Sequence, residues 1–199
     1  MILDSGSGAV RFLFAHGAGA PMDSPFMNEV AAALAGQGIR VIRFEFPYMA
    51  ARRAGARKPP DREAVLLDTW RTIIAAHRGE GPVFIGGKSM GGRMATMIAD
   101  EVDVEGVICF GYPFHPPGKP DKLRIAHLRD IRTPVLMLQG TRDALGFREE
   151  IEPMELSKAV RIEWIEDGDH SLKPRVKSGR TLEANLDQAS KAAADFILS

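Results

Sequence analysis

The sequence has one cysteine, few aromatic residues, no excess charge of either sign and no long hydrophobic run. Cys109 stands alone among 199 residues, which excludes an intrachain disulfide framework and a thiolate-rich zinc site. The 26 basic and 26 acidic side chains cancel, whereas a dedicated nucleic-acid-binding protein usually carries a clear basic excess. No apolar run approaches the roughly 20 residues of a membrane span, and the first residues lack the basic stretch of a secretory signal. We therefore expect a cytoplasmic protein that binds neither nucleic acid nor membrane.

The hydrophobic content is sufficient for one sizeable core. Hydrophobic residues make up 45% of the chain, and a chain of this size buries roughly 70% of its unfolded surface. We expect a single domain over residues 1–199. Short apolar runs predict strands at residues 10–15, 40–46, 82–86, 104–110, 134–140 and 160–165. Helical spacing marks residues 26–37, 61–77, 90–100 and 181–198. The alternation predicts an α/β fold with a mostly parallel sheet of about six or seven strands.

Two long segments follow predicted strands. Residues 49–60 and 111–130 are rich in proline, glycine and basic side chains, and we expect them to be loops. In an open α/β sheet, loops at the carboxyl ends of the strands surround the ligand crevice. Solvated connection is the alternative role for most residues in them.

The strongest local motif is Gly87-Lys88-Ser89-Met90-Gly91, a G-x-S-x-G sequence. It follows the predicted strand at 82–86 and opens the helix at 90–100. Such a sharp strand-to-helix turn brings backbones close together, so small residues are needed two positions either side of the serine. We expect Ser89 in a strained conformation with its hydroxyl above the sheet. The alternative is a glycine-rich helix start in which the serine only caps the helix.

The same stretch resembles the end of a phosphate-binding loop, G-x-x-x-x-G-K-[ST]. That motif requires a glycine at the position that Pro82 occupies, and Gly81 comes one residue too early. The sequence therefore does not favour a nucleotide phosphate site here.

A serine hydroxyl needs a base to remove its proton, and the base needs an acceptor that orients it. His170 follows the last predicted strand, and Asp143 follows the strand at 134–140. Both therefore lie at the carboxyl ends of strands, at the same sheet edge as Ser89. The order Ser, Asp, His along the chain is the order of one known class of catalytic triad. We predict that Ser89, Asp143 and His170 are catalytic.

Acyl transfer also requires N–H donors directed at the developing oxyanion. The Met90 N–H at the helix start is the first candidate. The second is expected after an earlier strand, where His16-Gly17-Ala18-Gly19 follows the strand at 10–15. We assign it to Ala18, with Gly19 as the alternative, and read His16 as a structural residue of the loop.

Together these motifs resemble the α/β-hydrolases, specifically the small lidless type related to dienelactone hydrolases. The resemblance spans His16 to His170, and it implies Ser89 as nucleophile, His170 as base and Asp143 as its partner. Dienelactone hydrolases use a cysteine nucleophile, so their lactone specificity does not carry over to Ser89. Because only nine residues precede Val10, we expect the first strands of larger hydrolases to be missing.

Residues for substrate binding are less clearly marked. Tyr48, Tyr112 and His115 follow two strands at the carboxyl edge, where they would either line the pocket or cap the core. Basic residues gather in three segments near that edge and predict either a rim that favours anionic substrates or a solvated mixture of charges. These residues are Arg52, Arg53, Arg57, Lys58, Lys119, Lys122, Arg124, Arg129, Lys173, Arg175, Lys177 and Arg180.

The sequence thus predicts a serine hydrolase that cleaves a small ester or thioester through an acyl-enzyme, with an anionic substrate if the basic segments form a rim. No cofactor or metal is required by this chemistry. A non-catalytic interaction module of the same fold, or a small peptidase or amidase, is the alternative. The sequence does not specify an oligomeric state.

Overall fold

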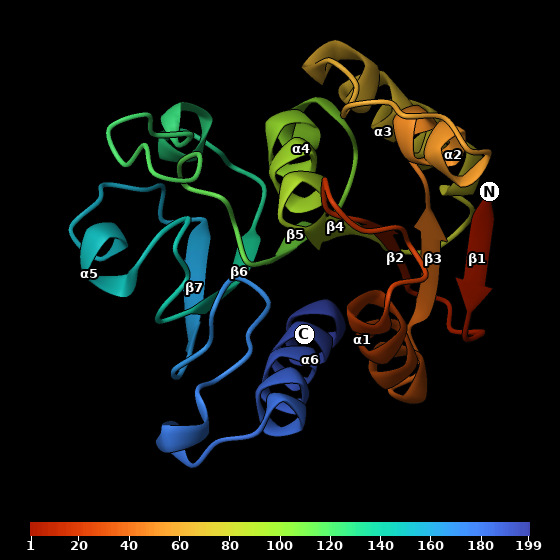
Figure 1. The fold of residues 1–199 in the computed structure, drawn as a ribbon. Helices are drawn as coiled ribbons and strands as arrows, with labels where there is room; N and C mark the ends of the chain where they lie inside the picture. The colour runs from red at the N-terminus through yellow and green to blue at the C-terminus, as the bar shows by residue number, and fades with distance from the viewer.

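A seven-stranded sheet forms the centre of the protein (Figure 1), in a computed structural model that describes all 199 residues. The strand order is β1-β3-β2-β4-β5-β6-β7, and every neighbouring pair is parallel except β1 with β3. The strands are β1 (Ile2–Ser5), β2 (Arg11–Ala15), β3 (Arg40–Phe44), β4 (Val83–Lys88), β5 (Gly106–Phe110), β6 (Val135–Gly140) and β7 (Val160–Ile165). All carboxyl ends from β2 to β7 therefore meet at one edge of the sheet.

Helices cover both faces of the sheet (Figure 1). On one face α1 packs against α6, and on the other α3 packs against α4 beside the short helix α2. The helices are α1 (Pro25–Gly36), α2 (Pro47–Arg53), α3 (Glu63–His77), α4 (Met90–Ile98), α5 (Arg148–Ile151) and α6 (Leu182–Leu198). Three single turns of 3-10 helix complete the elements, namely η1 (Ala99–Glu101), η2 (Ala126–Arg129) and η3 (Val176–Ser178). This arrangement confirms the predicted α/β-hydrolase architecture.

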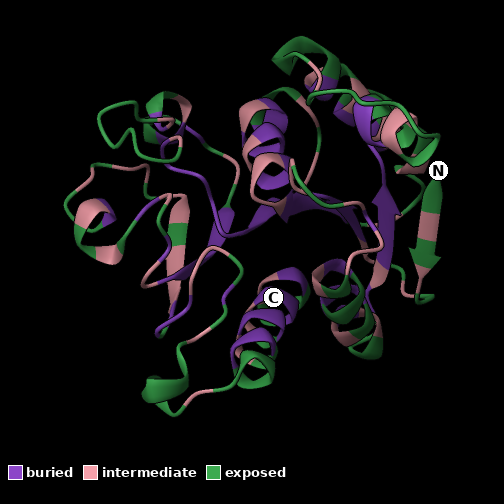
Figure 2. Ribbon diagram, in the orientation of Figure 1, coloured by how far each residue is buried: buried purple, intermediate pink, exposed green.

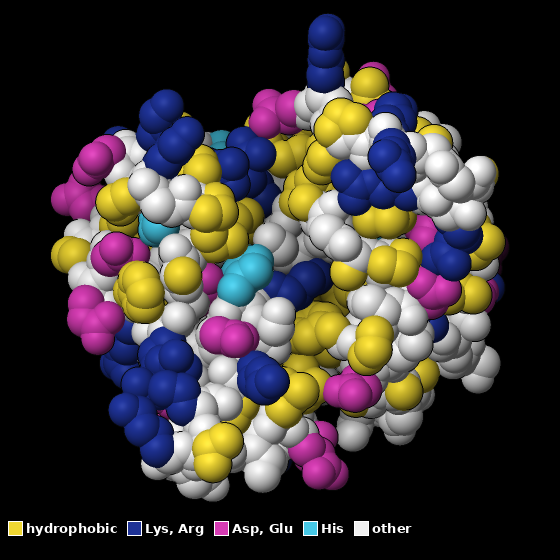
Figure 3. Space-filling view, viewed as in Figure 1, with side chains coloured by type: hydrophobic (Ala, Val, Ile, Leu, Met, Phe, Trp, Pro, Cys, Tyr) yellow, Lys and Arg dark blue, Asp and Glu magenta, His cyan; other side chains and the backbone are white.

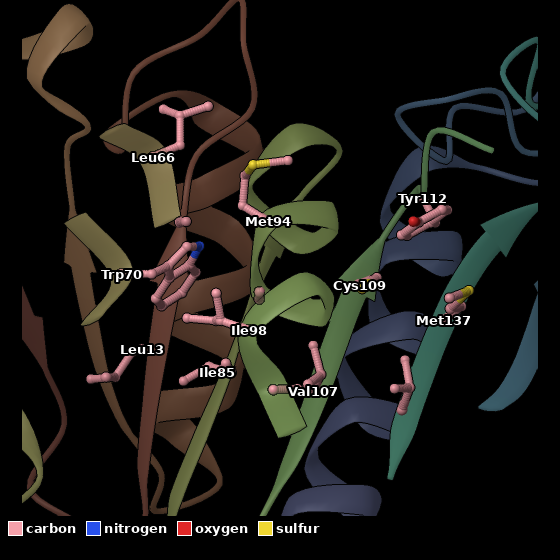
Figure 4. Packing of buried hydrophobic residues seen from close by; sticks show 14 of the residues in the cluster. Leu13, Leu66, Trp70, Ile85, Met94, Ile98, Val107, Cys109, Tyr112 and Met137 are labelled. Atoms are coloured by element: carbon pink, nitrogen blue, oxygen red, sulfur yellow. The ribbon is translucent and has the colours of Figure 1, made fainter. Parts of the chain in front are cut away.

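Each face of the sheet has its own hydrophobic core, and buried residues concentrate in the middle strands (Figure 2). All residues of β5 and β6 are buried, whereas the edge strands β1 and β7 are largely half-exposed. On the α3 and α4 side, Trp70, Met94 and Ile98 pack over side chains of the central strands (Figure 4). Cys109 lies in this core, fully buried. Continuous apolar strands are what a sheet covered on both faces requires.

Local sequence explains where several helices begin. Pro25 follows Ser24 at the first position of α1, where its missing N–H costs no helical hydrogen bond. Thr181 precedes α6, and its hydroxyl oxygen accepts a hydrogen bond from the Ala184 N–H at 3.1 Å.

Two expectations about the chain's elements were wrong. A leading strand is present, because β1 pairs antiparallel with β3 and Arg40 binds Asp4 across the pair at 2.5 Å. The strand β1 has only four residues, all of them exposed or half-exposed, so its sequence shows no clear hydrophobic pattern. The segment 49–60 is not loop throughout, because Pro47 starts α2 and the alanine-rich stretch after it continues the helix to Arg53.

None of the helices combines the length and the apolar character needed to cross a bilayer. The cellular location of the protein stays a prediction.

Candidate active site

Three polar side chains from different loops meet at the carboxyl edge of the sheet. Ser89 follows β4, Asp143 follows β6 and His170 follows β7. The Ser89 Oγ lies 2.8 Å from the His170 Nε2, and the His170 Nδ1 lies 2.7 Å from the Asp143 Oδ2. The structure thus brings the three predicted catalytic residues into one continuous hydrogen-bonded chain.

Ser89 sits on a strained turn between β4 and α4. Its φ of 51° and ψ of −115° place a non-glycine residue outside the ordinary regions of backbone conformation. A Cβ on Gly91 would approach the His16 carbonyl oxygen to 2.6 Å, and one on Gly87 would approach the Ala15 oxygen to 2.5 Å. Glycine at both positions is therefore needed for β2, β4 and α4 to approach each other so closely. Such strain costs about 1–3 kcal/mol and is common at functional sites.

The Asp143 carboxylate is fully buried and has partners on both oxygens. Its Oδ1 accepts a hydrogen bond from the Leu145 N–H at 2.8 Å, and its Oδ2 accepts one from the Gln139 side-chain amide at 2.9 Å. Because the ionised carboxylate only accepts, the His170 Nδ1 is the donor in their contact. The His170 Nε2 is then free of hydrogen in the neutral ring and accepts from the Ser89 hydroxyl. This is the tautomer that a general base requires.

The loop that carries His170 is fixed by hydrogen bonds within the loop and by one hydrogen bond from Lys88. The Asp169 Oδ1 accepts hydrogen bonds from the N–H groups of Ser171 and Lys173 at 2.8 and 3.0 Å, which closes the turn. The Lys88 Nζ donates to the His170 carbonyl oxygen. Lys88 precedes Ser89 at the end of β4, so one short segment holds both the nucleophile and the loop of its base.

The Lys88 ammonium lies in a largely desolvated position. Burial lowers its pKa to about 8, while the charges of Asp143 and Asp169 oppose that shift. Its Nζ lies 5.6 Å from the centre of the Phe26 ring, on which the cation packs. The charge of Lys88 is therefore directed toward groups of the protein itself.

The loop of His16, Gly17, Ala18 and Gly19 is held by two buried aromatic residues. The Tyr48 hydroxyl lies 3.1 Å from the Ala18 carbonyl oxygen, to which it donates a hydrogen bond. The His16 Nε2 accepts from the Phe46 N–H at 3.1 Å, so its Nδ1 carries the proton that contacts the Gly17 oxygen at 2.7 Å. Burial lowers the pKa of His16, in keeping with a neutral structural ring.

The predicted oxyanion donors Ala18 and Met90 both lie beside Ser89. Met90 is the first residue of α4, so its N–H has no acceptor within the helix. No turn or loop hydrogen bond has the Ala18 or Gly19 N–H as donor. These N–H groups are available to a ligand, and their role as oxyanion donors stays a prediction.

Ser89 lies at the junction of two hollows on the face seen in Figure 3. The first, here called the Phe26 hollow, has a volume of about 300 Å³. It is lined by Gly17, Ala18, Gly19, Ala20, Ser24, Phe26, Met27, Lys88, Ser89, His170 and Ser171. The second, here called the arginine hollow, has a volume of about 390 Å³. It is lined by Ala18, Asp61, Glu63, Leu66, Ser89, Met90, Arg93, Met94, Pro113, Pro117, Arg124 and Leu145.

The three residues predicted to bind substrate lie beneath the surface instead. Tyr48 and Tyr112 are fully buried, His115 is 3% exposed, and none of the three lines either hollow. The Tyr112 hydroxyl donates to the Arg124 carbonyl oxygen at 2.8 Å, and the His115 Nε2 lies 3.3 Å from the Glu150 Oε2. The polar ends of these side chains bond to loop backbone and to a carboxylate, so they support the loops and do not face a ligand, contrary to the prediction.

Three of the twelve residues of the predicted basic rim are paired with carboxylates of the protein. Arg53 binds Glu45 at 2.5 Å and Asp23 at 2.8 Å, Lys58 binds Asp61 at 2.7 Å, and Arg175 binds Asp167. Of the twelve predicted rim residues only Arg124 lines a hollow at Ser89. Pairing of this kind reduces the charge that a rim offers to a distant anion.

Three contributors to the site were missed by sequence reasoning: Lys88, Gln139 and Arg93. The Gln139 side chain is fully buried, with its Oε1 accepting from the Tyr112 N–H at 2.7 Å while its amide donates to Asp143. Its position at the end of β6, four residues before Asp143, was the only available signal. No group of three or more His, Cys, Asp or Glu side chains is placed to hold a metal ion.

Comparison with known proteins bears on the fold. The sequence matches a family described as "Alpha/beta hydrolase domain" over residues 8–198. Among solved structures, an alpha-beta serine hydrolase homologue from Coxiella burnetii superposes with a TM-score of 0.74 at 17% identity, covering 96% of this chain and 89% of that one. A dienelactone hydrolase from Anabaena variabilis gives a TM-score of 0.70 at 20% identity, covering 99% and 89%.

A serine hydrolase without a lid from Xanthomonas campestris gives a TM-score of 0.69 at 18% identity, covering 96% of this chain and 88% of that one. At these identities the structural likeness concerns the fold, whereas the sequence match extends over nearly the whole chain. The chain belongs to the α/β-hydrolase domain family.

Proposed function

We propose that the protein is a serine hydrolase that cleaves small esters or thioesters through an acyl-enzyme. The observation that carries the proposal is the hydrogen-bonded chain from the Ser89 hydroxyl through His170 to the buried Asp143, at 2.8 and 2.7 Å. The nucleophile lies on a strained turn where two hollows meet, so a carbonyl carbon has access to it. A hydroxyl with an oriented base is the arrangement that nucleophilic acyl transfer requires.

The first half of the reaction forms the acyl-enzyme. The Ser89 Oγ attacks the carbonyl carbon while the His170 Nε2 takes the hydroxyl proton, and Asp143 stabilises the imidazolium that results. The carbonyl oxygen gains negative charge, which the N–H groups of Ala18 and Met90 would stabilise. When the tetrahedral intermediate collapses, His170 returns the proton to the departing alcohol or thiol.

The second half repeats these steps with water. His170 removes a proton from a water molecule, and the resulting hydroxide attacks the acyl carbon. The bond to the Ser89 Oγ then breaks, and the oxygen takes the proton from His170 as the carboxylic acid leaves. Every proton transfer in this sequence uses the same ring nitrogen.

The two hollows suggest where the parts of a substrate lie. His170 lines the Phe26 hollow and does not line the arginine hollow. Since the acid must reach the leaving oxygen, the alcohol or thiol belongs on the Phe26 side. The acyl part then extends into the arginine hollow.

Steady-state hydrolysis of a panel of short esters, thioesters and amides tests the proposal. We expect turnover of esters or thioesters by the native protein and its loss in Ser89→Ala and His170→Ala. Ser178→Ala, which changes a serine of η3 away from both hollows, is the matched control. Preferential amide cleavage would instead identify an amidase. No turnover by folded protein would favour a non-catalytic interaction module and would contradict the proposal.

A further inference from the structure

The arginine hollow contains two guanidinium groups beside the nucleophile. Arg93 lies one helical turn after Ser89, and its N–H donates to the Ser89 carbonyl oxygen at 3.0 Å. Arg124 comes from the segment between β5 and β6. Both line the same hollow as Ser89, Ala18 and Met90.

The Arg93 guanidinium is only partly satisfied by the protein. Its Nη2 lies 3.1 Å from the Glu63 Oε2, but its buried Nε has no hydrogen-bond partner. The Glu63 side chain is 50% exposed, whereas that of Arg93 is 20% exposed. A half-solvated carboxylate neutralises a largely buried cation incompletely, because water screens the exposed partner.

Arg124 has no acidic partner at all. Its side chain makes no ion pair and no hydrogen bond within the protein, although its backbone is fixed by Phe114 and Tyr112. Burial and the neighbouring charge of Arg93 both lower the pKa of Arg124. The remaining carboxylate of the hollow, Asp61, already binds Lys58 at 2.7 Å and accepts from the Tyr48 N–H at 2.7 Å.

The hollow therefore holds two guanidiniums, of which only that of Arg93 has a carboxylate partner, Glu63. Two like charges held together in a partly desolvated site repel each other, and an anion placed between them would relieve that repulsion. The planar guanidinium forms two parallel hydrogen bonds with a carboxylate, because the two groups have matching geometry. The apolar Leu66, Met94 and Leu145 line the same hollow and suit a short hydrocarbon chain.

We propose that Arg93 and Arg124 bind a carboxylate at the far end of the acyl group, so that the preferred substrates are monoesters or monothioesters of short dicarboxylic acids. This inference rests on the proposed function, which puts the acyl part in the arginine hollow. Ser89 displaces the alcohol or thiol as the acyl-enzyme forms, and water then releases the dicarboxylic acid. The selectivity for charge comes from these two side chains and not from the paired residues of the wider rim.

Two esters of equal chain length test the inference. Monoethyl adipate carries a terminal carboxylate where ethyl hexanoate carries a methyl group. We expect kcat/KM of the native protein to favour monoethyl adipate, and Arg124→Gln and Arg93→Gln each to reduce that preference about 10- to 100-fold, the effect of losing a hydrogen bond to a charged group. Arg129→Gln removes an exposed arginine outside both hollows and should keep the preference.

A binding measurement provides a readout that does not depend on turnover. Calorimetric titration of Ser89→Ala with monoethyl adipate should show tighter binding than with ethyl hexanoate. Adding Arg124→Gln to that variant should remove the difference, while adding Arg129→Gln should not.

The outcomes separate the two proposals. Efficient turnover of ethyl hexanoate with no preference for the acid, or a preference that survives in both arginine variants, overturns the carboxylate site and leaves the hydrolase intact. If neither ester is hydrolysed, the proposed function fails for esters, and the calorimetric titration still tests the carboxylate site. Binding of monoethyl adipate that Arg124→Gln abolishes supports the site, and equal binding of both esters overturns it.

Discussion

The two hollows that meet at Ser89 differ in how far their basic side chains are paired within the protein. In the Phe26 hollow the single cation, Lys88, donates to the His170 carbonyl oxygen and packs on an aromatic ring. In the arginine hollow Arg93 is paired only with the half-exposed Glu63, and Arg124 has no carboxylate partner. Lys88 thus holds the loop of His170, whereas Arg93 and Arg124 form the carboxylate site that we propose.

A basic residue near an active site therefore does not by itself indicate an anionic substrate. Arg53 and Arg175 carry the same charge as Arg124, yet both are bound to carboxylates of their own. What distinguishes Arg124 is the lack of an internal partner in a partly buried position.

The largest effect on kcat is expected from Asp143, which acts on substrates whichever hollow binds them. Asp143→Asn keeps the size of the side chain but favours the wrong tautomer of His170, so kcat should fall about 10⁴-fold. The loss should be equal for monoethyl adipate and ethyl hexanoate, because both hollows serve one nucleophile. Asp187→Asn, on the exposed side of α6, is the matched control for both substrates. A loss confined to one substrate would mean that Asp143 acts through binding.

A smaller change is expected from enlarging the Phe26 hollow. Phe26→Ala should raise the ratio of kcat/KM for bulky alcohol esters over ethyl esters by about tenfold, since the pocket gains room on the leaving-group side. The preference for a carboxylate in the acyl part should not move. A changed acyl preference with an unchanged alcohol preference would reverse our assignment of the two hollows.

Lys88 should introduce a moderate pH dependence. Its lowered pKa of about 8 means that the ammonium is charged below that pH and neutral above it. The neutral amine donates a weaker hydrogen bond to the His170 carbonyl oxygen than the ammonium does. We therefore expect kcat/KM to fall several-fold as the pH rises through about 8. Lys88→Met should have a lower plateau and lack this alkaline limb. A limb that persists in Lys88→Met would show that another group causes it.

The smallest effect concerns a paired arginine of the rim. The Arg175 guanidinium beside Asp167 lowers the pKa of that carboxyl from 3.8 to about 2. Because the folded-state pKa is the lower one, the pair stabilises the protein above the unfolded value, and this contribution disappears as the pH falls from 3.8 to about 2.

Arg175→Gln should therefore shift acid unfolding to higher pH, as followed by circular dichroism, and leave the preference for monoethyl adipate unchanged. A loss of that preference would show that the paired rim also binds substrate. An unchanged acid transition would argue against the stabilising role of the pair.

Much of the site could be predicted because its position follows from topology. Ser89, Asp143 and His170 each come directly after a strand, and parallel strands bring such residues to one edge. The glycines around Ser89 carry a local signal that depends only on the strand-to-helix turn. The order Ser, Asp, His along the chain matched a known class of triad, and the resemblance to the α/β-hydrolases agrees with the family match.

The residues that line the hollows could not be predicted in the same way. Tyr48 was expected near the pocket, but α2 turns it inward, where its hydroxyl supports the Ala18 loop. Arg93 and Arg124 are 31 positions apart in the sequence, and only the path of the loop after β5 brings them to one hollow. Such contacts depend on loop conformation, which hydrophobic periodicity does not encode.

His170 is expected to activate Ser89 as a nucleophile, and covalent labelling of the serine measures that activation. Native protein and the variants Ser89→Ala and His170→Ala are treated with a fluorophosphonate, followed by intact-mass measurement and peptide mapping. We predict a single adduct on Ser89 of the native protein and none on either variant. An adduct on another residue, equal labelling of His170→Ala, or no adduct on the folded native protein would contradict the account.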